Sequence, residues 1–176
     1  MEMPNENLEF HRGSVVVRPM HPQDIPAFEA CLAGQGWPSR REAYLRRLTQ
    51  ASLGTLIALT AQVNGEIAGH ICLYPRKDAG PFQGMAYIED LLVFERFQHK
   101  GVASLLMDAA ESVAQRFGSV VTLGVGLHSG YGRAQRMYAR RGYVSDGSGV
   151  WYGDAAASAY ETVCNDDCLI LYLKKD

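Results

Sequence analysis

Apolar residues along the chain follow two different spacings. Short runs of branched apolar residues bounded by glycine, proline or asparagine are typical of strands, and an apolar residue at every third or fourth position is typical of a helix with one buried face. On this basis strands are predicted at residues 14–18, 55–63, 66–74, 87–94, 119–125 and 168–174. Helices are predicted at residues 22–33, 40–51, 102–117 and 132–141. Residues 144–164 contain short strand-like pieces whose order the pattern does not reveal.

Three features of this pattern are informative about the sheet. Asn64-Gly65 separates two apolar runs, and this dipeptide is the strongest short signal for a β-hairpin. The unbroken apolar run 91–93 is typical of a central strand that is covered on both faces. The helix at 102–117 lies between two strands, which predicts one parallel crossover after an antiparallel meander. We therefore expect a single α/β (α+β mixed) domain over residues 1–176, with a mixed central sheet of about six to seven strands flanked by about four helices.

Composition and charge narrow the class of partner. A chain of 176 residues can bury a hydrophobic core as one domain. Its net charge of −2 gives no reason to expect a nucleic acid or an anionic membrane as a partner. No apolar run approaches the roughly 20 residues that span a bilayer, and the polar, acidic residues 1–7 are unlike a secretory signal, so a cytoplasmic location is expected. No metal site is predicted, because Cys164 and Cys168 have no histidine or further cysteine nearby.

The segment from Leu91 to Ala103 joins a buried strand to the start of a long helix. The first amides of such a helix have no intrahelical acceptor and lie at the positive end of the helix dipole, so they form a site for a phosphate or diphosphate. Gly101 and Ala103 are small enough to let a ligand approach the backbone, and Arg96 and Lys100 add positive charge. Because many strand-to-helix junctions look like this, the loop alone does not identify the ligand.

Residues 98–103, Gln-His-Lys-Gly-Val-Ala, resemble the Q/R-x-x-G-x-G/A motif of the GNAT superfamily of N-acetyltransferases. The resemblance implies that acetyl-CoA is the cosubstrate and that the loop amides hold its pyrophosphate, with the hydroxyl of Ser104 as a further donor. It also implies that backbone groups of the preceding strand pair with the pantetheine arm. The cofactor contacts expected on this basis are Leu91, Val93, Gln98, His99, Lys100, Gly101, Val102, Ala103 and Ser104.

A second segment, residues 130–143, resembles the family's N-x-x-A-x-x-x-Y-x-x-x-G-F sequence. Tyr131 stands where the family has asparagine, and the positions that match the spacing are Ala134, Tyr138, Gly142 and Tyr143. The resemblance implies an N-acetyltransferase in which a primary amine attacks the thioester directly. In such an enzyme the tyrosine hydroxyl lies near the thioester sulfur, which makes Tyr138 the expected general acid.

The general base is expected on the central strand. Glu89 and Asp90 are neighbours there, so their side chains point to opposite faces unless a bulge intervenes. Glu89 shares the side of Leu91 and Val93 and is the preferred candidate. Asp90 remains an alternative, as does His128, which lies at the end of the following strand and has a suitable intrinsic pKa.

Two other interpretations fit parts of the sequence. Gly124-x-Gly126-x-x-x-Gly130 follows a strand and precedes a helix, as in dinucleotide-binding folds, but too few residues follow Gly130 to build the remaining βα units. A GNAT-like domain that binds acyl-CoA without turnover would share the loop at 98–103, and it remains the main alternative to an enzyme.

Neither motif encodes the acceptor, which is expected to be an amine on a small molecule or on a peptide. Aromatic residues outside the motifs are candidates for the wall of its pocket: Trp37, Tyr44, Trp151 and Tyr152. Dimerisation is common among relatives, and the sequence leaves a homodimer open.

Overall fold

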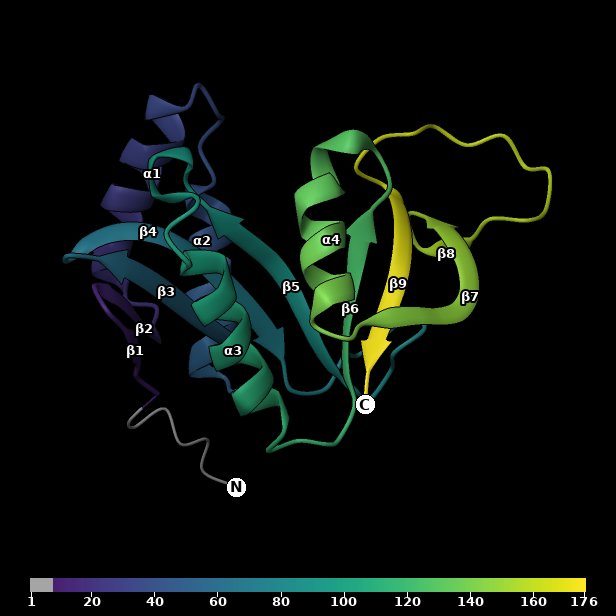
Figure 1. Ribbon diagram of the computed structural model, residues 1–176, viewed down its shortest axis with the longest axis horizontal. Helices are drawn as coiled ribbons and strands as arrows, with labels where there is room; N and C mark the ends of the chain where they lie inside the picture. The colour runs from purple at the N-terminus through teal and green to yellow at the C-terminus, as the bar shows by residue number, and fades with distance from the viewer. Residues whose placement is uncertain (1–7) are drawn as a thin grey trace.

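The computed structural model of the protein describes residues 8–176 and contains one mixed sheet with helices on both faces (Figure 1). The interpretation of residues 1–7 as unlike a secretory signal falls outside this range. The helices are α1 (Ile25–Gly34), α2 (Arg41–Ser52), α3 (Val102–Ala114) and α4 (Gly132–Arg140). The strands are β1 (Phe10–Arg12), β2 (Val15–Pro19), β3 (Ile57–Val63), β4 (Glu66–Tyr74), β5 (Ala86–Val93), β6 (Val121–Gly126), β7 (Val144–Tyr152), β8 (Ala155–Ala156) and β9 (Leu169–Lys175). None of the helices within residues 8–176 combines the length and apolar character needed to cross a membrane.

The predicted fold class is confirmed, and the sheet has more strands than expected. The described chain forms a nine-stranded sheet in the order β1-β2-β3-β4-β5-β6-β9-β7-β8. The additional strands carry little apolar pattern, because β1 and β8 have three and two residues and β7 is glycine-rich and largely exposed. The hairpin predicted at Asn64-Gly65 is confirmed, with φ of 51° and 83° at these residues as a type I′ turn requires.

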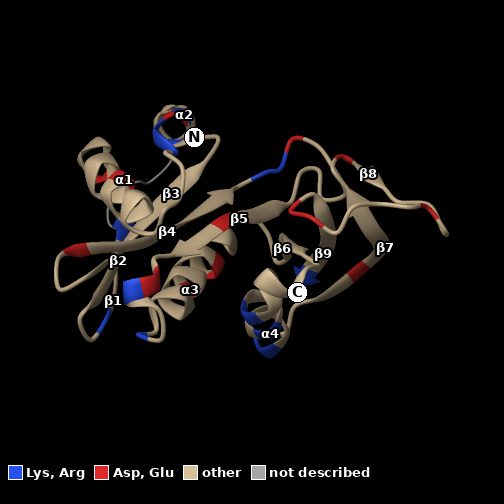
Figure 2. Cartoon of the chain, turned by 90° about the horizontal axis from the view of Figure 1, so that it is seen from above, with Lys and Arg blue, Asp and Glu red and all other residues tan. Residues whose placement is uncertain are grey.

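The helices divide between the two faces of the sheet. Figure 2 shows α1 and α2 on one face and α3 and α4 on the other. Helix α3 packs against β4 and β5, and its buried face includes Leu106 and Met107, which are fully inaccessible. This helix therefore anchors the centre of the sheet from the face opposite α2.

The sheet opens between its two central strands. β5 and β6 pair in parallel over only three residue pairs, the last being Ile88 with Leu123. Beyond that point the strands diverge, and the two halves of the molecule separate like the arms of a V (Figure 1). One edge of β5 from Glu89 onward, and one edge of β6 from Gly124 onward, are therefore left without a neighbouring strand.

A β-bulge interrupts β5 where this opening begins. The register between β4 and β5 shifts between His70 and Cys72, and Asp90 adopts a left-handed conformation with φ of 54°. Beyond the bulge the strands approach closely at Gly69, where a Cβ would lie 2.3 Å from the carbonyl oxygen of Leu92. Only glycine fits at this position without moving the backbone of β5.

The bulge is held by the side chain of Asp90. Its carboxylate forms ion pairs with Arg40, at 3.2 Å, and with Arg47, and it accepts a hydrogen bond from Nε2 of His70 at 3.1 Å. Burial lowers the pKa of His70, so its imidazole is neutral at pH 7 and donates this bond. Burial alone would raise the pKa of Asp90, but the bond from His70 and the two guanidiniums outweigh it and hold this pKa well below 3.8.

We expect Asp90→Asn to destabilise the protein by about 2 to 4 kcal/mol, because the half-buried Arg47 would lose its counter-ion. A depressed carboxyl pKa stabilises the fold above the usual value of 3.8, and this contribution is lost as the pH falls below it. Urea unfolding at pH 7 and at pH 3 measures both effects. The variant should lose less stability than the original chain between the two values, and equal losses would contradict the assigned role.

Candidate functional site

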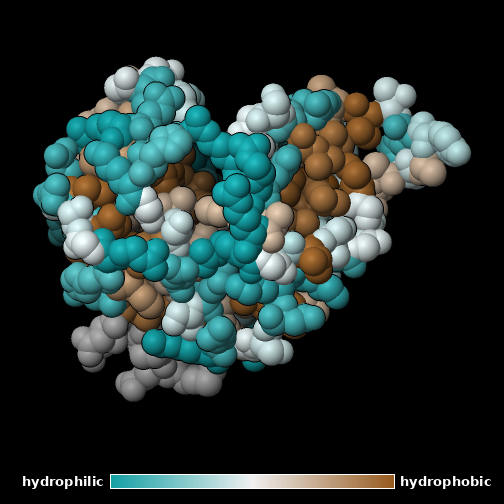
Figure 3. All heavy atoms as spheres, in the orientation of Figure 1, coloured by the Kyte–Doolittle hydropathy of each residue, from teal (hydrophilic) through white to brown (hydrophobic). Residues whose placement is uncertain are grey.

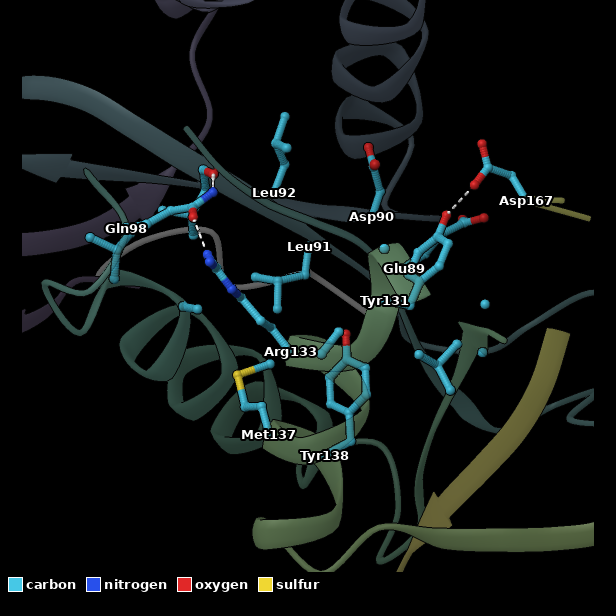
Figure 4. A pocket seen from close by; sticks show the side chains of 18 of the residues that line it. Glu89, Asp90, Leu91, Leu92, Gln98, Tyr131, Arg133, Met137, Tyr138 and Asp167 are labelled. Atoms are coloured by element: carbon cyan, nitrogen blue, oxygen red, sulfur yellow. Dashed lines mark hydrogen bonds between the residues drawn. The ribbon is translucent and has the colours of Figure 1, made fainter. Parts of the chain in front are cut away.

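The opening between β5 and β6 is a cavity of about 1110 Å³ in the described part of the chain (Figure 4). Most of its lining residues fall into four groups. They are the loop and first turn of α3, the exposed edges of β5 and β6, one side of α4, and arginines at the start and on the inner side of α2. In Figure 3 the cavity appears as a notch between the two halves of the molecule, with hydrophilic residues along it.

The first turn of α3 presents unpaired amides to this cavity. Gly101 precedes the helix with φ of 78°, a conformation that favours glycine, and no side chain within residues 8–176 caps the helix. The first intrahelical bond runs from the amide of Leu105 to the carbonyl of Gly101, so the amides of Val102, Ala103 and Ser104 have no acceptor in the helix. The first turn also contains no acidic residue. This arrangement fits a diphosphate, which requires several donors and a positive potential.

The loop that precedes α3 is tied to both neighbouring elements through Gln98. Its Nε2 donates to the carbonyl oxygen of Val93 at 3.3 Å, and its Oε1 accepts from Nη1 of Arg133 on α4 at 2.7 Å. Eight of the nine expected cofactor contacts line the cavity. The exception is Lys100, whose Nζ lies over the ring of Phe97 at 5.3 Å from its centroid.

The diverging strands supply backbone groups to the same cavity. Leu91 and Val93 lie beyond the last residue of β5 that pairs with β6, so one edge of their backbone is available to an extended ligand, apart from the carbonyl of Val93 that accepts from Gln98. On the opposite strand, Nε2 of Gln135 donates a hydrogen bond of 2.8 Å to the carbonyl oxygen of Gly126. The bulge at Asp90 breaks the regular pairing of β5 on its other edge as well. A narrow acyl chain can therefore enter between the strands and meet polar backbone groups.

Tyr138 projects from α4 into the cavity, with its hydroxyl pointing toward Leu91 (Figure 4). The residue is 7% exposed, and its ring packs edge-on against Tyr143. Burial, with a smaller effect of Tyr131, raises the pKa of Tyr138 to about 12. The hydroxyl therefore keeps its proton at neutral pH, as a general acid must.

The three candidate bases have different environments. Glu89 is exposed, lines the cavity and forms no salt bridge with the rest of the described chain. Asp90 also lines the cavity, but its carboxylate is held by the two arginines and His70. His128 is not among the lining residues, and both of its nitrogens are engaged, Nδ1 with the amide of Gly130 at 3.1 Å and Nε2 with Asp167 at 2.9 Å. The geometry favours Glu89.

The glycines that suggested a dinucleotide fold, Gly124, Gly126 and Gly130, line the cavity, and each lies close to a side chain. A Cβ on Gly126 would lie 2.3 Å from the ring of Tyr131, and one on Gly130 would lie 2.6 Å from the ring of His128. Tyr131, which replaces the family's asparagine, donates from its hydroxyl to Asp167 at 2.9 Å. The glycine spacing is therefore explained by packing around Tyr131 and His128.

Some lining residues carried no recognisable signal in the sequence. Arg40, Arg46 and Arg47 line the cavity on the α2 side, although their charges resemble those of any solvated helix face. The only available signal was that Arg47 follows the buried Tyr44 by three positions, on the inner side of the helix. Of the aromatic candidates, Trp37 lines the cavity, whereas Tyr44 is buried in the core and Trp151 and Tyr152 lie elsewhere. No group of three or more metal-binding side chains occurs in residues 8–176.

Comparisons with known proteins agree with this geometry. Solved structures of similar fold include a Salmonella typhimurium acetyltransferase that modifies the N-terminal serine of ribosomal protein L7/L12 (14% identity, 93% of this chain and 95% of that one, TM-score 0.70). They also include Ard1 from Thermoplasma volcanium (21%, 92% and 97%, TM-score 0.64) and yncA of Salmonella typhimurium with its cofactor acetyl-CoA (14%, 93% and 94%, TM-score 0.64). No curated protein matches the sequence significantly. The family model described as the acetyltransferase (GNAT) family matches residues 23–143, more than half of the chain, and the protein therefore belongs to this family.

Proposed function

We propose that the protein transfers the acetyl group of acetyl-CoA to a primary amine, with Glu89 as the base and Tyr138 as the acid. The observation that carries this proposal is the uncapped first turn of α3, which opens into the same cavity as the unpaired edge of β5. The first turn of α3 fits a diphosphate, and the unpaired edge of β5 fits an extended arm that contains amides. Family membership supplies the chemistry that joins the two.

The cosubstrate would be held along the α3 and α4 face. The amides of Val102, Ala103 and Ser104 bind the diphosphate, and the backbone of Leu91 and Val93 binds the arm. Acetyl-CoA supplies an acyl group activated as a thioester. The thioester then lies at the bulge of β5, within the part of the cavity lined by Glu89 and Tyr138.

Each catalytic group has one proton to move. Glu89 accepts a proton from the ammonium of the acceptor, directly or through a water molecule, because only the neutral amine is a nucleophile. Backbone amides released by the bulge donate to the carbonyl oxygen as negative charge develops on it. Tyr138 donates its proton to the sulfur as the carbon–sulfur bond breaks, and the second proton that the bonded nitrogen loses restores the tyrosine hydroxyl. The products are an amide and free coenzyme A.

The acceptor amine belongs to a small molecule or to a peptide. The Salmonella relative acts on a protein N-terminus, which supports a peptide amine as one class to test. At 14% identity this structural similarity indicates a shared fold and does not identify the substrate.

The central experiment combines acetyl-CoA binding, measured by calorimetry, with release of free thiol over a panel of amines. We expect Ala103→Glu to weaken acetyl-CoA binding at least tenfold, or about 1.4 kcal/mol, because a carboxylate would face the diphosphate site. Ser112→Glu, exposed on the same helix and away from the cavity, is the control and should bind normally. Unchanged binding in Ala103→Glu would refute the diphosphate site. Normal binding without thiol release from any amine would favour a binding module.

Tyr138→Phe should lower kcat by roughly 10² to 10⁴, the usual contribution of a positioned acid. Acetyl-CoA affinity should change little, because the ring and its packing against Tyr143 are retained. Steady-state kinetics and calorimetry on the same preparation separate these effects. A variant with full turnover would show that another group protonates the sulfur.

Glu89→Gln should lower kcat/KM by a similar factor of roughly 10² to 10⁴ at neutral pH. The loss should shrink as the pH rises, because the acceptor then deprotonates without help. Glu42→Gln, on the exposed side of α2, is the matched control. A pH–rate profile parallel to that of the original chain would exclude Glu89 as the base.

A further inference from the structure

We infer that the acceptor amine carries a carboxylate or a similar oxyanion, and that Arg46 and Arg40 bind this group while the amine faces Glu89. The inference rests on the proposed function, since it names the class of amine that the same site accepts. It follows from the distribution of charge on the side of the cavity formed by α2.

Arginines dominate this side of the cavity. Arg40 precedes α2 directly, and Arg46 and Arg47 lie within it, and all three line the cavity. Helix α2 covers the face of the sheet opposite α3, and basic residues are visible on it in Figure 2. The arginines are therefore separated by the sheet from the proposed diphosphate site, so they are available to a second ligand.

The protein itself neutralises only part of this charge. Asp90 is the one carboxylate that forms salt bridges with these arginines in residues 8–176, and it is shared between Arg40 and Arg47. Three guanidiniums against one carboxylate leave a net charge of +2. Glu29 lies close to Arg40, but it accepts from the backbone amide of Arg40 and from the Ser39 hydroxyl, and it does not line the cavity.

The two outer arginines are accessible while the inner one is not. The side chain of Arg47 is 13% exposed and is committed to the bulge, whereas that of Arg40 is 36% exposed. Arg40 bonds Asp90 through both Nη atoms, at 3.2 and 3.4 Å, and Asp90 does not use its remaining N–H groups. Arg46 is exposed and has no salt-bridge partner in the described chain. Guanidinium groups bind carboxylates and other oxyanions through paired hydrogen bonds, so this pair is suited to an anionic group of the acceptor.

The opposite charge lies where the amine must react. Glu89 is exposed, forms no salt bridge in the described chain and is adjacent to the bulge, and after burial its charge and its hydrogen bond with Tyr74 contribute to the raised pKa of Tyr74. An incoming ammonium is attracted to Glu89, and an oxyanion on the same molecule is attracted to α2. A polyamine would place its second positive charge against the arginines, so the site discriminates against it.

The test uses matched acceptors that differ only in the acidic group. Phenylalanine, phenylalaninamide and phenethylamine form one set, and the peptides Ser-Asp-Phe-amide and Ser-Asn-Phe-amide form another, which separates free amino acids from peptide N-termini as the source. Thiol release gives kcat/KM for each. The original chain should prefer the carboxylate-bearing member of at least one set by tenfold or more.

Arg46→Gln should remove most of that preference, through a roughly tenfold rise in KM for the anionic member alone. Comparing the ratios of the two members between variants cancels differences in amine basicity. Arg46→Lys should retain part of the preference. Arg41→Gln, exposed on the same helix and outside the cavity, should retain all of it.

The possible outcomes separate this inference from the proposed function. The inference is overturned if the enzyme acetylates the amines that lack an acidic group as well as it acetylates the anionic members. It is also overturned if Arg46→Gln affects the anionic and the non-acidic acceptors equally. Either result leaves the N-acetyltransferase assignment standing. Absence of thiol release with every amine overturns both. A carboxylate preference that Arg46→Gln abolishes and Arg41→Gln retains supports it.

Discussion

The ion pairs of Asp90 are the interaction on which the shape of the cleft depends. A left-handed backbone conformation at a residue other than glycine costs about 1 to 2 kcal/mol. Hydrogen bonds to charged groups contribute about 1.5 to 3 kcal/mol each, so the bonds from His70 and the two arginines exceed this cost. The bulge is thereby fixed at the position where β5 leaves β6. Without it, β5 would continue its regular pairing with β4, and Asp90 would not lie beside Glu89 in the lining of the cavity.

Fixing this one residue organises both faces of the sheet. On the α3 face, the strand leads through a short loop into a helix whose first amides face the cavity. On the α2 face, the arginines that hold Asp90 also form the wall of the cavity. The donor and the acceptor can thus approach the same opening from opposite sides, with Glu89 and Tyr138 lining the space between them. The proposed direct transfer is compatible with this arrangement, because the amine can add to one face of the thioester carbonyl while the coenzyme occupies the α3 side.

The sequence predicts the parts of this site that depend on local structure. The loop at 98–103 is predictable because glycine, small residues and a helix start follow one another along the chain, and its resemblance to the family motif indicates the ligand. The hairpin at Asn64-Gly65 was recognised for the same reason. The sequence does not reveal β7, because its pairing with β9 is long-range and its glycines weaken any alternation of apolar and polar residues. Helix α3 ends three residues earlier than predicted, at Ala114, since the apolar stripe continues into a turn through Phe117.

The choice between Glu89 and Asp90 shows why the other residues of the site could not be predicted from local sequence. In a regular strand the two side chains alternate, and the sequence cannot tell which faces the cavity. With the bulge, both side chains line the cavity, and they differ in their partners. The partners of Asp90 lie 50, 43 and 20 residues away in the chain, at the start of α2, within α2 and on β4. The arginines of α2 carry no signal in the sequence for the same reason. A cationic helix face can bind a ligand only where the fold places it beside a cavity, and this depends on distant segments. The features that resemble the family motifs thus lie in contiguous segments, while the partners of Asp90 arise from contacts between distant segments. Among the three arginines, burial assigns Arg47 to the bulge and leaves Arg46 facing the cavity, which is why specificity for the acceptor is to be sought on α2 and not in the motifs.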